Sequence, residues 1–220
     1  MHDYAMLAHG DRVLVAVSGG VDSLVLVHLL AAWREKAPLS YELMPVHVAM
    51  AGASSSPGAM ALGLARDLTA RGLTLRVVSA TSDPAGEDYA ARDCFTCARS
   101  RRTRLFEEAR RQACNKIAFG HHQDDLIETF LLNLTCAGNI STMRPRQDLF
   151  DGRLALIRPL AYVEKAAIRK IARANGLRPV PCTCPQAGRS RRAAMQDVAA
   201  DLYRRIPGAK KNIFAALGNV

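Results

Sequence analysis

A short turn near the N-terminus has the residue types that bind a phosphate group. It follows the apolar run 12–17 and contains Ser18, Gly19, Gly20, Val21, Asp22 and Ser23. Two glycines let the backbone approach an anion closely, and the start of a following helix offers unpaired N–H groups and a positive dipole end. Asp22 can hold Mg²⁺ between phosphate oxygens. A simpler interpretation is a tight turn in which Asp22 only caps the helix, but its place after the first strand favours a phosphate loop.

A second polar group follows a later strand. Directly after the apolar run 116–119 come Gly120, His121, His122, Gln123, Asp124 and Asp125. Aspartate at a helix start often serves only as a cap, yet two adjacent aspartates after two histidines favour a chemical role. We predict that Asp125, with Asp124 nearby, places Mg²⁺ and a nucleotide α-phosphate opposite the first turn. The histidines are expected to point in different directions, and they lack partners at the spacing of zinc ligands.

Cysteine spacing suggests a third centre of chemistry. Cys94 and Cys97 form a C-x-x-C pair followed by arginines, and Cys182 and Cys184 form a late C-x-C pair. Basic neighbours lower the pKa of a thiol, which suits metal or sulfur chemistry. Four thiolates can bind zinc, three can hold an iron–sulfur cluster with one iron left open, and a redox dithiol is a further alternative. The two unpaired cysteines are expected to be buried, small apolar residues: Cys114 and Cys136.

The elements that must position these groups alternate along the chain. Because the strand candidates are nearly continuous apolar runs between amphipathic stretches, we predict an α/β fold with a parallel, Rossmann-like sheet and helices on both faces. Ligands bind at the carboxyl ends of strands in such folds. Strands are predicted over 12–17, 42–49, 73–79, 116–119 and 154–158, and loops over 80–93 and 137–152. Helices are predicted over 22–36, 58–71, 95–113, 124–135, 163–175, 190–204 and 209–217.

The order of these elements and the distribution of apolar residues also predict the domain organisation and the location of the protein. A main domain is expected over 1–187, with a helical C-terminal segment over 188–220. No apolar run approaches the roughly 20 residues that span a bilayer, and the N-terminus has no secretory pattern. We therefore expect a cytoplasmic protein that makes no use of a membrane.

Charge and composition indicate the class of partner. The chain has 30 Lys and Arg against 20 Asp and Glu, a formal net charge of +10. This favours a polyanionic partner such as nucleic acid, although a basic surface can also serve solubility. Aromatic residues make up only 5% of the chain, which argues against a protein that binds single strands by base stacking.

The two polar motifs resemble those of a known family. Ser-Gly-Gly-x-Asp-Ser after a strand is similar to the signature of PP-loop ATPases, and Gly-His-His-x-Asp-Asp is similar to the second motif of PP-loop enzymes that modify tRNA. The resemblance implies that ATP is split into AMP and pyrophosphate while a substrate oxygen is adenylated. It also implies that ATP is bound by Ala16, Ser18, Gly19, Gly20, Asp22, Ser23, His47, Val48, Gly120 and Asp125.

The cysteines narrow the resemblance to the tRNA-cytidine(32) 2-sulfurtransferases, or 2-thiocytidine synthetases. It covers nearly the whole chain and implies a [4Fe–4S] cluster, Mg²⁺, ATP and tRNA. Three cysteines would hold the cluster: Cys94, Cys97 and Cys182, with Cys184 as the alternative third ligand because the late cysteines lie one residue apart instead of two. Val21 stands where thiolating members usually carry lysine. The similar segments are Cys94–Arg102, Lys116–Asp125, Ile157–Tyr162, Pro181-Cys182, Pro207-Gly208 and Asn219-Val220.

The same resemblance implies a reaction. A pyrimidine C2 oxygen would attack the α-phosphate of ATP, and sulfur supplied through the cluster would then displace AMP. Asp22, Asp125 and Arg101 are the predicted catalytic residues, with Arg101 either stabilising charge near AMP or holding an RNA phosphate. Arg102 and Arg158 have the same two interpretations, beside that of an ordinary basic surface.

Further partners and alternatives remain open. The sulfur donor would be a cysteine desulfurase or inorganic sulfide, and the family resemblance makes a homodimer an expectation. Other PP-loop chemistries fit the ATP motifs as well: 2-thiouridine synthesis, sulfur transfer to a small molecule and lysidine-type ligation. A non-catalytic zinc and RNA-binding module on the same fold is the alternative of a different class.

Overall fold

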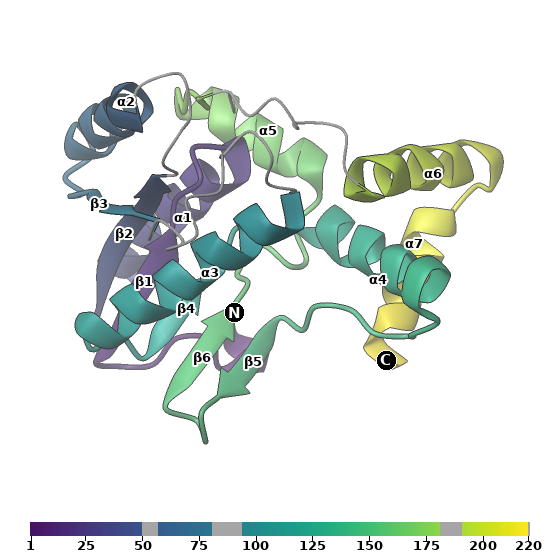
Figure 1. Ribbon diagram of the computed structural model, residues 1–220, viewed down its shortest axis with the longest axis horizontal. Helices are drawn as coiled ribbons and strands as arrows, with labels where there is room; N and C mark the ends of the chain where they lie inside the picture. The colour runs from purple at the N-terminus through teal and green to yellow at the C-terminus, as the bar shows by residue number, and fades with distance from the viewer. Residues whose placement is uncertain (50–56, 81–93, 181–190, 220) are drawn as a thin grey trace.

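The computed structural model describes residues 1–49, 57–80, 94–180 and 191–219. These residues form a six-stranded sheet of order β3-β2-β1-β4-β6-β5 (Figure 1). Strands β3, β2, β1, β4 and β6 are parallel, and β5 is antiparallel to β6. The strands are β1 (Asp11–Ala16), β2 (Tyr41–Ala49), β3 (Arg76–Ser79), β4 (Lys116–Ala118), β5 (Arg146–Leu149) and β6 (Leu154–Ile157). The predicted α/β architecture is confirmed.

Helices cover both faces of the sheet because side chains of buried strands alternate between two apolar faces. Val13 and Val15 pack with Leu26 of α1 in one cluster, whereas Leu14 packs with Leu105 of α3 in the other. In Figure 1, α3 crosses in front of the sheet. The helices are α1 (Val21–Lys36), α2 (Pro57–Thr69), α3 (Cys94–Arg111), α4 (Gln123–Ala137), α5 (Lys165–Ala174), α6 (Arg191–Arg205) and α7 (Ala209–Ala216), with short 3-10 turns η1 (His2–Tyr4) and η3 (Leu217–Asn219).

The loop predicted over 137–152 is wrong in part, because it contains β5. This strand forms a hairpin with β6, and the connecting residues Phe150, Asp151 and Gly152 have φ of 54°, 56° and 79°. Asp-Gly is a strong local signal for such a turn. The sequence of β5, Arg-Gln-Asp-Leu, is polar because the strand lies at the sheet edge, so it lacks the apolar run of a buried strand.

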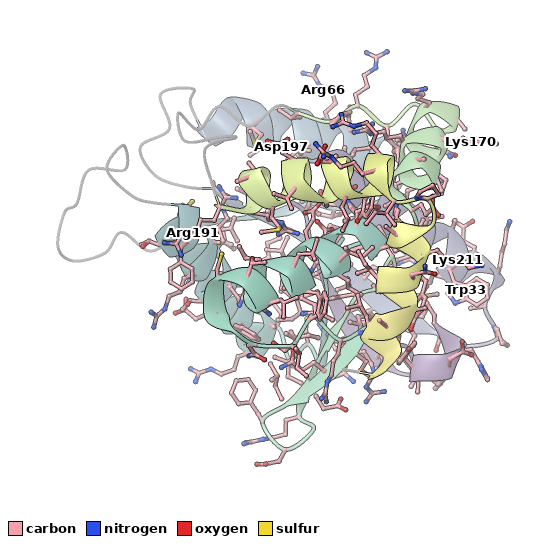
Figure 2. The ribbon with its side chains drawn as sticks, turned by 90° about the vertical axis from the view of Figure 1, so that its right-hand side faces the viewer. Trp33, Arg66, Lys170, Arg191, Asp197 and Lys211 are labelled. Atoms are coloured by element: carbon pink, nitrogen blue, oxygen red, sulfur yellow. The ribbon has the colours of Figure 1, made fainter. Side chains whose placement is uncertain are left out.

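The C-terminal helices pack on α4, away from β3 and α2 (Figure 1). Figure 2 shows α6 alongside α4, with α7 crossing near their ends. Aromatic contacts join the two ends of the chain: the ring of Tyr162 stacks on Tyr4 at 5.8 Å and meets Phe214 of α7 edge-on at 5.3 Å. The boundary predicted at 187/188 lies outside the described residues.

Two structural expectations for cysteines have opposite outcomes. Cys114 is buried as predicted, and burial raises the pKa of its thiol. Cys136 is exposed, so that prediction was wrong. Its position explains the difference, because the end of α4 and residues 137–140 are exposed to solvent. In the residues described, no helix is long and apolar enough to cross a membrane.

Candidate active site

The turns after β1 and β4 meet at the carboxyl edge of the sheet, backbone against backbone. A Cβ atom on Gly120 would lie 3.0 Å from the carbonyl carbon of Asp22 and 3.1 Å from the nitrogen of Ser23. These distances are shorter than ordinary van der Waals contacts and involve backbone atoms, so a side chain would force the two turns apart and glycine favours this approach. The contact follows from topology, since β1 and β4 are neighbouring parallel strands. The structure thus brings the two predicted motifs into one site.

The turn after β1 is organised by its own serines. Ser23 is buried, and its Oγ donates to the Gly20 carbonyl at 2.9 Å and accepts from the Ser18 N–H at 3.2 Å. Gly19 has φ +89°, a conformation that favours glycine. Ser23 therefore shapes the turn, whereas Ser18 is exposed. No side chain caps the start of α1, so its first N–H groups and the Ser18 hydroxyl suit an anion.

Three aspartates converge beside this turn, and we name them the carboxylate triad: Asp22, Asp124 and Asp125. His122 is buried among them. Its Nε2 lies 3.7 Å from Asp22 Oδ1 and 3.4 Å from Asp125 Oδ2, and its Nδ1 lies 3.7 Å from Asp124 Oδ2. Negative charges this close repel one another, so the triad requires nearby positive charge.

That charge comes from helices much later in the chain. Each aspartate pairs with a cation of α5, α6 or α7, and none of these cations was predicted. The pairs are Lys165 Nζ with Asp22 Oδ1 at 2.6 Å and Oδ2 at 2.7 Å, Arg192 Nη2 with Asp125 Oδ1 at 2.5 Å, and Lys210 Nζ with Asp124 Oδ1 at 2.8 Å. Sequence alone has no local signal for these pairs, because they depend on how the last helices pack.

The aspartates differ in their structural roles. Both oxygens of Asp22 face Lys165, and the start of α1 has no side-chain cap, so Asp22 is not the helix cap of the simpler interpretation. Asp125 does stabilise a helix start, because its Oδ2 accepts the His122 N–H at 2.8 Å. Its Oδ1 meets Arg192, which leaves the two oxygens with different partners.

Asp124 is the aspartate of the triad whose pKa is lowered. Burial by itself would raise the pKa of Asp124, but hydrogen bonds from the Lys210 side chain and the Lys165 backbone outweigh it and lower that pKa. Within the described residues no group of three or more His, Cys, Asp or Glu side chains is arranged to hold a metal. Mg²⁺ typically takes one or two carboxylates and completes its shell with phosphate and water. Asp22 and Asp125 fit that mode, and Lys165 and Arg192 occupy the same oxygens here.

His47, near the end of β2, offers a hydrogen-bond acceptor at the same edge of the sheet. His47 is buried, and its Nδ1 lies 2.8 Å from the Val17 carbonyl. Because a carbonyl only accepts, Nδ1 carries the proton. Burial lowers the pKa of His47, the bond to Val17 opposes this, and the charge of Arg101 lowers it further. The ring is therefore neutral, with Nε2 as an acceptor. Val48 is buried and Ala16 half-buried.

The predicted histidine directions are confirmed. His121 stacks on Phe119, with ring centroids 5.5 Å apart, whereas His122 faces the triad. Lys116 does not reach the site, because it lies at the start of β4 and pairs with Asp11 at 3.4 Å. All ten residues predicted to bind ATP thus lie at or just beyond the carboxyl ends of β1, β2 and β4.

The cysteine centre is described only in part. Cys94 is the first residue of α3, and Cys97 lies one turn later. Cys97 is a free, half-buried thiol packed against the apolar cluster beneath α3. Cys182 and Cys184 lie outside the described residues. Because the Cys97 thiol is free and partly accessible, it could serve as a ligand of a metal or cluster.

The chain is similar in sequence to proteins of a known family. A family model described as PP-loop domain matches residues 2–193. The tRNA-cytidine(32) 2-sulfurtransferase of Geobacter metallireducens is 37% identical over 227 residues, covering 99% of this chain and 85% of that protein. The protein of the same name from Syntrophotalea carbinolica is 37% identical over 220 residues, with the same coverage of 99% and 85%.

Two solved structures share the fold. The U34-tRNA thiolase NcsA from Methanococcus maripaludis, solved with its [4Fe-4S] cluster, matches with a TM-score of 0.78 at 22% identity, covering 97% of this chain and 72% of that one. The phosphoadenylyl-sulfate reductase from Candida auris, a phosphate complex, matches with a TM-score of 0.51 at 11% identity, covering 81% and 79%. At these identities the likeness supports the fold alone.

Proposed function

The chain belongs to the PP-loop family and, within it, to the tRNA-cytidine(32) 2-sulfurtransferases, and from this premise we propose that it thiolates tRNA in an ATP-dependent reaction. The product would be 2-thiocytidine, with AMP and pyrophosphate released. The observation that supports the proposal most strongly is the backbone contact between the turns after β1 and β4, with the carboxylate triad beside the turn that would bind phosphate. The relatives named for this reaction match 99% of the chain.

ATP would lie along the carboxyl edge. Its base would sit at the end of β2, where the neutral His47 offers an acceptor and Val48 an apolar surface. Its pyrophosphate end would rest on the turn after β1, against the exposed Ser18 and the uncapped start of α1. Asp22 and Asp125 would hold Mg²⁺, which neutralises phosphate charge when bound.

Adenylation activates the base for sulfur transfer. The C2 oxygen of the pyrimidine would attack the α-phosphorus, and the bond to pyrophosphate would break. Arg101, whose charge acts on His47, would stabilise the charge that develops on the α-phosphate. The oxygen then belongs to a good leaving group, so a sulfur nucleophile can attack C2 and AMP departs with that oxygen.

Three cysteines would hold the group that delivers sulfur to this site. Cys94, Cys97 and Cys182, with Cys184 as the alternative third ligand, would hold a [4Fe–4S] cluster, which supplies an open iron site for the transferred sulfur. The half-buried Cys97, four residues before Arg101 on α3, supports this arrangement. The sulfur itself would come from a cysteine desulfurase or from inorganic sulfide.

Nucleoside mass spectrometry tests the proposal. The chain and its Asp125→Asn variant are expressed in a bacterium that lacks its own 2-thiocytidine enzyme, and total tRNA is digested and analysed. We expect 2-thiocytidine with the wild-type chain and almost none with the variant. The appearance of 2-thiouridine instead, or of no thiolated nucleoside, would contradict the proposed product.

Metal and sulfide analysis tests the cysteine centre separately. Protein purified without oxygen should contain about four irons and four acid-labile sulfides per chain. Cys94→Ala and Cys97→Ala should lose both, whereas Cys136→Ala, which changes an exposed thiol at the end of α4, should lose neither. One tightly bound zinc and no sulfide would contradict the cluster and leave the ATP site standing.

A further inference from the structure

Arg158, at the carboxyl end of β6, is a buried cation without a paired carboxylate in the described residues. It is 6% exposed. Its Nη1 donates to the Arg144 carbonyl, and its buried Nε has no hydrogen-bond partner. Burial, and then the charge of Arg102, lowers the pKa of Arg158 to about 10. Burying a guanidinium without an anion is unfavourable, so this position suits a ligand that brings negative charge.

Other positive charge gathers around the same place. Burial, followed by the charges of Arg158, Arg192 and Arg102, lowers the pKa of His121 to about 3. The Nδ1 atom of His121 is also buried without a hydrogen-bond partner. Arg192 is already compensated by Asp125, whereas Arg102 is an exposed residue of α3 that no carboxylate of the described residues pairs with. The charges of Arg158 and Arg102 are therefore the ones that an external anion could neutralise.

The position of this cluster identifies the source of the anion. Along the carboxyl edge the order of strand ends is β2, β1, β4 and β6. Strands lie about 4.8 Å apart, so the end of β6 lies roughly 10 Å beyond the turn after β1. If ATP extends from β2 to that turn, its phosphates stop short of Arg158. In the proposed reaction the RNA would present its target base from the other side of the triad.

We propose that Arg158, Arg102 and His121 form a subsite for a backbone phosphate of the RNA next to the target nucleotide. Guanidinium groups match phosphate oxygens geometrically, and the two buried nitrogens supply positions for hydrogen bonds. The subsite would hold the RNA so that its pyrimidine faces the α-phosphate. This inference rests on the proposed function, because it takes the substrate to be RNA.

Binding measurements on three variants test the subsite. Arg158→Gln and Arg102→Gln should each weaken binding of tRNA about tenfold and make the dependence of log affinity on log salt shallower by about one. Arg110→Gln, which removes the same charge from an exposed position about two turns further along α3, near its C-terminal end, should change neither. Affinity for ATP, measured without RNA, should stay at the wild-type value in all three. Because Arg102 is exposed, its variant tests the subsite even where Arg158→Gln is poorly folded.

A modified RNA then locates the phosphate. In a hairpin that carries the target cytidine, a methylphosphonate beside that nucleotide removes one backbone charge, and the loss caused by Arg102→Gln should then largely disappear. A fall in ATP affinity with unchanged tRNA affinity would assign the arginines to the nucleotide and overturn the inference. Unchanged affinity for both would overturn it as well. If the wild-type chain binds tRNA but makes no thiolated nucleoside, the proposed function fails while the subsite stands.

Discussion

The turn after β1 is shaped by local hydrogen bonds between residues at most five positions apart, as between Ser18 and Ser23, although the Gly19 carbonyl also accepts the Val180 N–H and Asp22 binds Lys165. The turn after β4 depends on partners 41 and 67 positions away, the Lys165 backbone for Asp124 and the Arg192 side chain for Asp125. The first turn can therefore be recognised from a short sequence. The second needs the last helices to be in place before its charges are balanced. The motif residues can thus be identified from the sequence, whereas the cations that pair with them can be identified only from the folded structure.

The largest expected effect comes from the triad itself. Asp125→Asn should lower tRNA-dependent ATP–pyrophosphate exchange about 10²–10³-fold, the usual cost of removing one charged group that stabilises a transition state. Asp151→Asn, a change of the same kind at an exposed turn, should leave exchange unaltered. If Asp125→Asn retains exchange and only loses stability, the residue does no more than stabilise the start of α4.

The contact between the two turns is tested by Gly120→Ala. Because the new Cβ would meet the Asp22 and Ser23 backbones at 3.0–3.1 Å, the free energy of unfolding should fall by about 1–3 kcal/mol. Gly63→Ala in α2 is the matched control, since nothing lies within 4 Å of its Cβ position, and it should raise stability by up to about 1 kcal/mol. Urea unfolding measures both, and equal effects would argue against the close approach.

The smallest expected effect concerns the distant cations. Lys210→Met should lower the free energy of unfolding by about 0.5–1 kcal/mol at pH 7. Since the folded pKa of Asp124 is lowered, this contribution is present above the unfolded pKa near 3.9 and should shrink as the pH falls through the folded value. Lys211→Met, at the neighbouring exposed residue labelled in Figure 2, should show no such pH dependence. A difference between the variants that stays constant as the pH falls from 7 to well below about 3.9 would exclude the pairing with Asp124 as its cause.

How far the sequence could predict this molecule depended on the range of the interactions. Continuous apolar runs such as 116–119 marked the central strands, and the glycines of the first turn marked the phosphate loop, because both signals are local. The edge strand β5 was not predicted, because its sequence is polar and contains no continuous apolar run. Lys165, Arg192 and Lys210 were missed because their contacts with the triad arise only when α5, α6 and α7 pack against the rest.

The order of the charges along the chain has a consequence for synthesis on the ribosome. The triad is translated by residue 125, whereas its three paired cations follow at 165, 192 and 210. A nascent chain that has reached only α4 carries these three negative charges without the partners that balance them. The three ion pairs of the triad are thus complete only when residue 210 has emerged and α7 has docked.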